Sequence, residues 1–297
     1  MEKKPKITVV GSINMDLVSI TDQVPQKGET LMGKKFFMNP GGKGANQAVA
    51  AARLGAHVRM IGCVGDDSFG ESLTQHLHKE GIDITHVEPV SDSTGTATII
   101  VSDNDNSIIV VPGANLHVTA DFVESKRDII ADSDILILQL EIPLEGVKKA
   151  VAIASENGVE TILNPAPICD LPDEILEQVT YLTPNEHEYA SLIKNMDQNT
   201  IQEKVIMTKG SKGVAFFQQG IQLEIPAFKV NTVDTTGAGD SFNGGLAFAL
   251  GTGLSLEQAC KYGNAVGALS TMKLGAQKGM PKKEEVEAIL KNEAVIS

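Results

Sequence analysis

Two patterns of apolar and polar residues alternate along the chain. Short apolar runs at 7–10, 58–64 and 160–163 each end at a glycine or at a cluster of turn-forming residues. Such runs predict strands that are buried on both faces, as in a parallel sheet. Longer stretches between them carry apolar residues three and four positions apart, which is typical of helices that pack on a sheet.

Strand and helix patterns alternate most clearly between residues 119 and 163. We expect helices over about Asp121 to Ala131 and Pro143 to Asn157, with strands over Asp134 to Leu140 and Glu160 to Leu163. Repeats of this length predict an α/β fold with a doubly wound, mostly parallel sheet sandwiched by helices. The same patterns predict later strands over 181–183 and 204–207, and helices over about 256–273 and 281–290.

A β-hairpin is predicted away from these repeats. Thr96 to Val101 and Ser107 to Val111 flank the polar turn 103–106, and residues 29–38 have a loosely extended pattern. We therefore expect a small β-sheet with strands from about 17–38 and 94–112, attached to a single domain over residues 1–297. Such a sheet could serve as a lid over a site, or as half of a dimer contact.

Composition narrows the classes of function. The 297 residues carry a net charge of −13 and contain no Trp, which argues against a nucleic-acid or anionic-membrane surface. Three scattered cysteines form neither a CxxC motif nor a disulfide framework, which fits a reducing cytoplasm. The first apolar run is too short for a signal-peptide core, and we expect no membrane-spanning stretch.

The stretch from Thr232 to Gly245 has the strongest chemical signal. A β-favouring lead runs into Gly237-Ala238-Gly239-Asp240, and a pattern with helical spacing follows. Glycines allow a tight turn, and the N–H groups of a helix N-terminus favour anions. Asp240 in the first turn adds a carboxylate, so the segment offers an anion cradle beside a base, as phosphoryl transfer requires. An ordinary helix cap after a glycine turn remains the alternative.

Other polar residues follow predicted strands, where open α/β sheets bind ligands. Asn14 and Asp16 could hold two sugar hydroxyls, and Glu141 follows the strand over 134–140. The glycines of 41–46 permit close approach to a ligand, although the P-loop spacing is absent. Turn, loop and helix-cap chemistry explain each of these residues equally well.

Two further segments suit a nucleotide. Asn185 and Glu188 would share one face at a helix start, near Mg²⁺ or phosphate, but their spacing also fits a capping box. The turn 208–213, rich in glycine and hydroxyl groups, could approach phosphates or ribose. No GxGxxG motif follows a strand with an acidic residue about twenty positions later, so the sequence argues against a nicotinamide-dependent oxidoreductase.

Together, these motifs resemble the phosphofructokinase-B-type sugar kinases over nearly the whole chain. The resemblance rests on 14–16 (NMD), 41–46 (GGKGAN), 185–188 (NEHE) and 234–240 (DTTGAGD), in this order and at these separations. It implies an α/β/α domain with a small β lid that forms a homodimer contact. It also implies that ATP, with Mg²⁺ and K⁺, phosphorylates the 5-hydroxyl of D-ribose in ribose catabolism.

The resemblance implies roles for individual residues. The catalytic base is Asp240, and the anion hole is Gly237, Ala238 and Gly239. The sugar-binding positions are Asn14, Met15, Asp16, Gly42, Lys43, Gly44, Ala45, Asn46, Glu141 and Asp240. The ATP-binding positions are Asn185, Thr208, Lys209, Gly210, Ser211, Lys212, Gly213, Gly239, Asp240 and Asn264. Glu188 is implied near Mg²⁺, and a monovalent-cation loop comprises Asp234, Thr236, Ser270, Lys273, Gly275 and Gly279.

The chain departs from the family pattern at two places. The segment from Asn185 to Thr208 is shorter than in many members, so a peripheral helix is expected to be short or absent. Gly279 lacks a side-chain oxygen that some members have at this position. Three alternatives also stay open: a related acceptor (2-deoxyribose or fructose), a nucleoside, or a sugar-binding regulator without catalysis.

Overall fold

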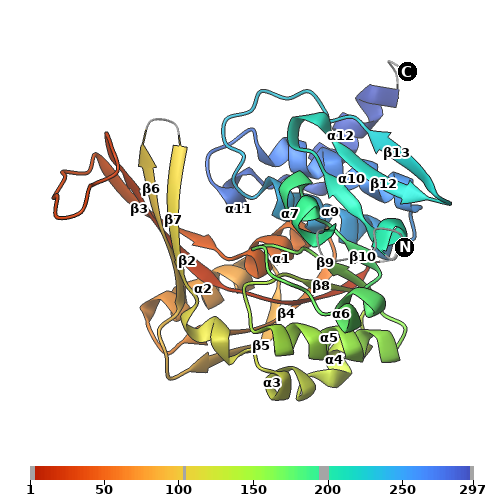
Figure 1. Cartoon of the computed structure of the whole chain (residues 1–297), viewed down its shortest axis with the longest axis horizontal. Coiled ribbons are helices and arrows are strands. Elements are labelled where there is room, and N and C mark those ends of the chain that lie inside the picture. The colour runs from red at the N-terminus through yellow and green to blue at the C-terminus, as the bar shows by residue number, and fades with distance from the viewer. Residues whose placement is uncertain (1–3, 103–104, 194–200, 295–297) are drawn as a thin grey trace.

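A six-stranded parallel sheet forms the centre of the computed structural model, which describes residues 4–102, 105–193 and 201–294 (Figure 1). The strand order is β10-β9-β8-β1-β4-β5. The strands are β1 (Lys6–Val10), β4 (His57–Gly65), β5 (Asp83–Val90), β8 (Ile135–Leu138), β9 (Glu160–Leu163) and β10 (Tyr181–Leu182). Neighbouring strands run parallel throughout, and helices cover both faces, which confirms the predicted doubly wound fold.

Side chains of the central strands alternate between two apolar cores. In β8, Ile135 and Ile137 pack into one core, while Leu136 and Leu138 pack into the other. The first core includes α1 (Lys43–Arg53), α2 (Ser68–Lys79), α9 (Ala238–Gly251), α10 (Leu256–Ser270) and α12 (Lys283–Ala294). The second includes η1 (Gly113–His117), α3 (Ala120–Glu124), α4 (Arg127–Ala131), α5 (Leu144–Glu156) and α6 (Asp173–Gln178). Burial on both faces explains why β8 is apolar without interruption.

The helix predicted over Asp121 to Ala131 is two short helices, α3 and α4. The hydroxyl of Ser125 donates to the Phe122 carbonyl at 2.6 Å, and such local bonds compete with helix continuation. Lys126 then leaves helical geometry, with φ −111° and ψ 17°. The prediction of one continuous helix was therefore wrong.

A small antiparallel sheet lies beside the β10 edge. It contains β11 (Ile206–Thr208), β12 (Val214–Gln218) and β13 (Ile221–Ile225), and η4 (Gly210–Lys212) forms the turn between the first two. The remaining short elements are α7 (Glu186–Leu192), η3 (Gln202–Lys204) and α11 (Ala276–Gly279). The short segment after Asn185 includes residues 194–200, which lie outside the described part of the chain, so the expectation of a missing peripheral helix stays untested.

A four-stranded sheet in the order β3-β2-β6-β7 projects from the body (Figure 1). Its strands are β2 (Asn14–Ile20), β3 (Lys35–Gly41), β6 (Gly95–Ser102) and β7 (Asp105–Val111). The hairpin β6–β7 was predicted. The extended pattern over 29–38 was partly wrong, because Gly28 has φ 85° and the Glu29 N–H closes a turn onto the Gln26 carbonyl.

The strand register gives the four-stranded sheet two different faces. One row across the sheet contains Asp16, Asn39, Ala97 and Val110. The neighbouring row, on the opposite face, contains Leu17, Met38, Thr98 and Ile109. Asp16 therefore lies on one face of the sheet, and the exposed side chains of Met38 and Ile109 lie on the other.

No helix within residues 4–102, 105–193 and 201–294 has the length and apolar character needed to cross a membrane.

Leu246 of α9 is fully buried in the first core and provides a test of its packing. We expect Leu246→Ala to lower the free energy of unfolding by about 3 kcal/mol, because the lost apolar contacts leave a cavity. Urea denaturation of this variant, beside Leu254→Ala as an exposed control, measures the effect. Equal losses in the two variants would contradict this account of the core.

Candidate active site

Asp240 lies in the first turn of α9 and is 7% exposed. The helix is preceded by Gly237, whose φ of 76° is left-handed and suits glycine; a Cβ there would lie 2.7 Å from the Cβ of Ala276. The first intrahelical bond runs from the Ser241 N–H to the Gly237 carbonyl. The Ala238 N–H donates to the Thr235 carbonyl. The next two N–H groups of the first turn, those of Gly239 and Asp240, have no intrahelical partner.

Two amide side chains from α1 hold the Asp240 carboxylate. Asn46 Nδ2 donates to Oδ2 at 2.8 Å, and Gln47 Nε2 donates to Oδ1 at 3.0 Å. A carboxylate has about four acceptor positions, so each oxygen can still accept a proton or a further bond. The sequence analysis missed Gln47, which is fully buried; its only local signal is its place next to Asn46 at the start of a helix.

Charged residues predicted to bind a sugar converge on Asp240. The negative charge of Asp240 raises the pKa of Lys43 more than burial lowers it, and Glu141 and Glu188 add to the rise. Burial, together with the charges of Glu141 and Asp240, raises the pKa of Asp16 to about 7. The charged groups of residues 16, 43, 141 and 240 therefore interact with one another. We call these four residues, Lys43 included, the acidic cluster.

Glu141 is fixed by two donors. The hydroxyl of Ser12 donates to Glu141 Oε2 at 2.6 Å, and the backbone N–H of Lys43 donates to the same oxygen at 3.1 Å. Ser12 was also missed from the sequence. Because these bonds join the end of β1, the start of α1 and the loop after β8, they fix three chain segments around the cluster.

The other predicted sugar-binding residues lie close to this cluster in sequence. Met15 and Ala45 are buried in the apolar core, and the side-chain oxygen Oδ1 of Asn14 accepts a bond from Asn115 Nδ2 at 2.7 Å. The glycines of this loop approach protein backbone: a Cβ on Gly42 would lie 2.7 Å from the Asn14 nitrogen, and one on Gly44 2.6 Å from the Ser12 nitrogen. These glycines are therefore explained by chain packing, whether or not a ligand also lies close.

The predicted nucleotide-binding segments also come together. Asn185 is the N-cap of α7 and forms with Glu188 the capping box that their spacing also allowed. A parallel bridge joins Asn185 to Thr208, which brings the turn over 208–213 beside α7. Burial raises the pKa of Glu188, and Lys43 partly offsets the rise, so the Glu188 carboxylate lies within electrostatic range of the acidic cluster.

Asn264 and the 208–213 turn meet at Pro226. Asn264 Nδ2 donates to the Pro226 carbonyl at 2.8 Å, and a Cβ on Gly213 would lie 2.7 Å from the Pro226 carbonyl carbon. Two lysines of the turn form ion pairs, Lys209 with Glu224 at 2.7 Å and Lys212 with Glu186 at 3.3 Å. Either ammonium group would therefore have to exchange its partner to bind a phosphate.

The predicted cation loop closes through Asp234. Its carboxylate accepts bonds from the Thr236 N–H and hydroxyl and from the Gly275 N–H, which lower its pKa although burial opposes them. Gly279 packs directly on Ser270: a Cβ would lie 1.9 Å from the Ser270 carbonyl oxygen. This contact leaves no space for a side chain at 279, and Lys273 is exposed.

Among the described residues, no three or more acidic, His or Cys side chains are arranged so that they could hold a metal ion together. The loop of Asp234 presents one carboxylate, and both of its oxygens accept bonds from the loop itself. Glu188 has one carboxylate oxygen bonded to the Asn185 N–H, which leaves the other for a hydrated Mg²⁺.

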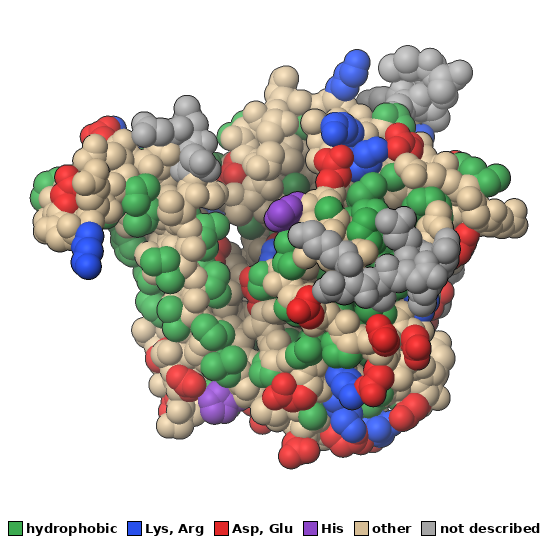
Figure 2. Space-filling view, viewed as in Figure 1, with side chains coloured by type: hydrophobic (Ala, Val, Ile, Leu, Met, Phe, Trp, Pro, Cys, Tyr) green, Lys and Arg blue, Asp and Glu red, His purple; other side chains and the backbone are tan. Residues whose placement is uncertain are grey.

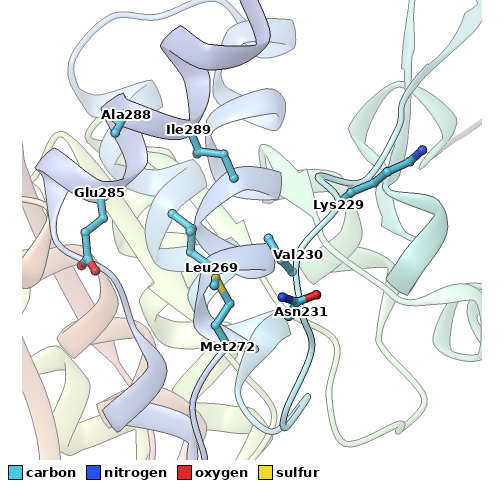
Figure 3. Close-up of a pocket in the computed structure, with 8 residues that line it drawn as sticks. All are labelled: Lys229, Val230, Asn231, Leu269, Met272, Glu285, Ala288 and Ile289. Carbon is cyan, nitrogen blue, oxygen red and sulfur yellow. The ribbon is translucent and has the colours of Figure 1, made fainter.

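The acidic cluster lies apart from a cavity beside α10 and α12. Figure 2 shows a hollow between the four-stranded sheet and the body, with side chains of both charges in it. A separate cavity of about 520 Å³ lies between the segment 229–231, α10 and α12, and contains none of the predicted site residues (Figure 3). In Figure 3 the Lys229 ammonium points away from the other labelled side chains.

Comparisons with known proteins agree over nearly the full chain. A model of the family described as "pfkB family carbohydrate kinase" matches residues 4–283. A ribokinase from Lactococcus lactis is 45% identical over 291 residues, which cover 96% of this chain and 97% of that protein. A structure of Arabidopsis thaliana ribokinase complexed with ribose and ATP is similar with a TM-score of 0.89 and 30% identity, covering 97% of this chain and 99% of that one. A deoxyribokinase from Salmonella typhi is 35% identical over 301 residues, covering 96% and 98%.

Asp16 generates a prediction about stability and pH. Its folded pKa of about 7 lies above the ordinary value of 3.8, so the protonated form favours folding. The stability that protonated Asp16 contributes is fully present below about pH 4 and is lost as the pH rises through about 7. We expect Asp16→Asn to gain stability relative to the unsubstituted protein over that range. Urea denaturation of both proteins between pH 4.5 and 8 measures it, and a constant difference would contradict the assignment.

Proposed function

Because the chain belongs to the pfkB family of carbohydrate kinases, we propose that it transfers the γ-phosphoryl group of ATP to the 5-hydroxyl of D-ribose. The products are D-ribose 5-phosphate and ADP, which would serve ribose catabolism. The observation that carries the proposal is the position of Asp240. Its carboxylate lies in the first turn of α9 and interacts with the charged groups of Asp16 and Lys43. The similarity to a ribokinase, and to a ribokinase complexed with ribose and ATP, supports the choice of sugar and phosphoryl donor.

In the proposed reaction, Asp240 accepts the proton of the attacking hydroxyl. An aspartate has an ordinary pKa of about 3.9, far below that of an alcohol, so it would be a weak base for early deprotonation. In a loose transition state the proton can move late, and kinases use aspartate in this role. The amide bonds from Asn46 and Gln47 fix the direction of the carboxylate.

Phosphoryl oxygens would lie at the N-terminus of α9. The N–H groups of Gly239 and Asp240 have no intrahelical partner, and the helix dipole adds partial positive charge. Loss of one such donor in an anion hole typically costs about 3–4 kcal/mol of transition-state stabilisation. Lys43 would stay protonated among its acidic neighbours, where it can bind a sugar oxygen.

The nucleotide would lie along Asn185, the 208–213 turn and Asn264, which the structure joins through Thr208 and Pro226. Mg²⁺, when bound, neutralises charge on the phosphates, and Glu188 is the residue that would hold its water shell. K⁺ would lie in the loop of Asp234, where Thr236, Ser270, Lys273, Gly275 and Gly279 would supply mainly backbone carbonyls. Such a cation would support the start of α9, which begins four residues after Asp234.

We assign the four-stranded sheet two roles in this proposal. The face that carries Asp16 would close over the sugar and exclude water. The opposite face exposes Phe36, Met38 and Ile109, which are 62%, 52% and 63% accessible, and would pack against a second copy in a homodimer. The three cysteines are all free thiols, which suits a cytoplasmic enzyme.

Asp240→Asn tests the catalytic base. We expect kcat to fall by about a hundredfold or more, because the amide cannot accept the proton. Ribose and ATP should still bind, since Asn fills the same space. Initial rates and calorimetric binding measure both properties, with Asp121→Asn on the opposite side of the sheet as the control. Near-normal turnover of Asp240→Asn would disprove this role.

The acceptor is tested by ADP release from ATP and Mg²⁺ with D-ribose, 2-deoxyribose, fructose or adenosine, each with K⁺ or with Na⁺ alone. We expect the highest kcat/KM with ribose and a higher rate with K⁺ than with Na⁺. A preference for 2-deoxyribose would favour the alternative of a deoxyribokinase. This sugar is included because the chain is similar to such an enzyme. Binding of ATP and ribose without turnover would favour a regulator.

A further inference from the structure

A line of hydrogen-bonded side chains connects Asp240 to α2 through Asn46 of α1. Asn46, which donates to Asp240, accepts a bond at its Oδ1 from Gln277 Nε2 at 2.9 Å. Gln277 in turn has its Oε1 2.7 Å from His76 Nε2 of α2. Gln277 is 5% exposed and lies in α11, far from Asn46 and His76 in sequence.

The direction of every bond in this line follows from the charge at one end. An ionised Asp240 only accepts, so Asn46 must turn its NH₂ group toward it. The Asn46 oxygen then faces Gln277, which must present its own NH₂ group. The Gln277 oxygen is left facing His76, whose Nε2 must therefore carry a proton, in the neutral or the charged ring. A flip of either amide would place oxygen against oxygen at one contact.

The backbone of this segment is held separately from the Gln277 side chain. Arg53 of α1 donates to the carbonyls of Gln277 and Met280, the latter at 3.1 Å, and forms an ion pair with Glu80. A change at the Gln277 side chain therefore leaves these anchors in place. Such a change tests the orientation of Asn46 and not the folding of the loop.

We propose that Gln277 is a positioning residue for the reaction, and that His76 fixes the direction of its amide. Through Asn46 the two residues hold the Asp240 carboxylate aimed at the acceptor hydroxyl. Neither touches the reacting atoms. The inference rests on the proposed function of Asp240 as base, and it adds two residues, one of them on a helix outside the predicted motifs.

The test compares Gln277→Met, which keeps the volume and removes the amide, with His76→Phe and His76→Gln. We expect Gln277→Met and His76→Phe to lower kcat about tenfold while the KM for ribose stays within twofold, since the bond to a charged base is weakened and the sugar contacts remain. His76→Gln retains an N–H donor near the Nε2 position and should restore most of kcat. Gln75→Met and His78→Phe, exposed neighbours on α2, are the matched controls.

A double-mutant cycle separates positioning from a general structural effect. Because Gln277 acts through Asn46, Gln277→Met should change kcat little further when Asn46→Ala is already present. Additive losses, or a parallel fall of kcat and sugar binding with a lower melting temperature, would show a merely structural role and overturn the proposal. So would variants that keep kcat within twofold. A wild-type protein inactive with every acceptor would instead refute the proposed function itself, and this role with it.

Discussion

The close packing of α1 against α9 brings together residues that are almost two hundred positions apart. A Cβ on Gly244 would lie 2.5 Å from the Cβ of Ala50, so the two helices can approach this closely only because α9 has a glycine there. On the other side of α9, Gly245 meets Val266 of α10 in the same way. This approach places the amides of Asn46 and Gln47 within hydrogen-bond distance of Asp240, and the geometry of the site depends on it.

The same packing explains how several acidic side chains can share a small volume. Asp16, Glu141 and Asp240 would repel one another if all were ionised without partners, and the raised pKa of Asp16 expresses that repulsion together with burial. Lys43 supplies a compensating charge, and hydrogen bonds hold the carboxylates of Glu141 and Asp240 in place. The cluster is therefore an arrangement that costs folding free energy and suits a polar, hydroxyl-rich ligand.

Local patterns predicted the fold better than they predicted the site. The apolar runs gave the parallel strands, because burial on both faces is expressed in each run itself. Asp240 and its glycines were found because a turn into a helix has a local signal. No motif surrounds Gln47, Ser12 or Gln277. Each of these side chains meets its hydrogen-bond partner only when distant segments of the chain pack together. The break at Ser125 was missed for a similar reason: one side-chain bond decided it.

The alternation of side chains in β2 links two properties that are usually considered separately. Asp16 points to one face of the four-stranded sheet and its neighbour Leu17 to the other, so both depend on one pairing with β3 and β6. A single inserted or deleted residue in this strand would exchange the two faces and put the carboxylate on the apolar side. A change of length in the loop between Ile20 and Lys35 would instead leave both faces as they are, because no strand pairing is disturbed there.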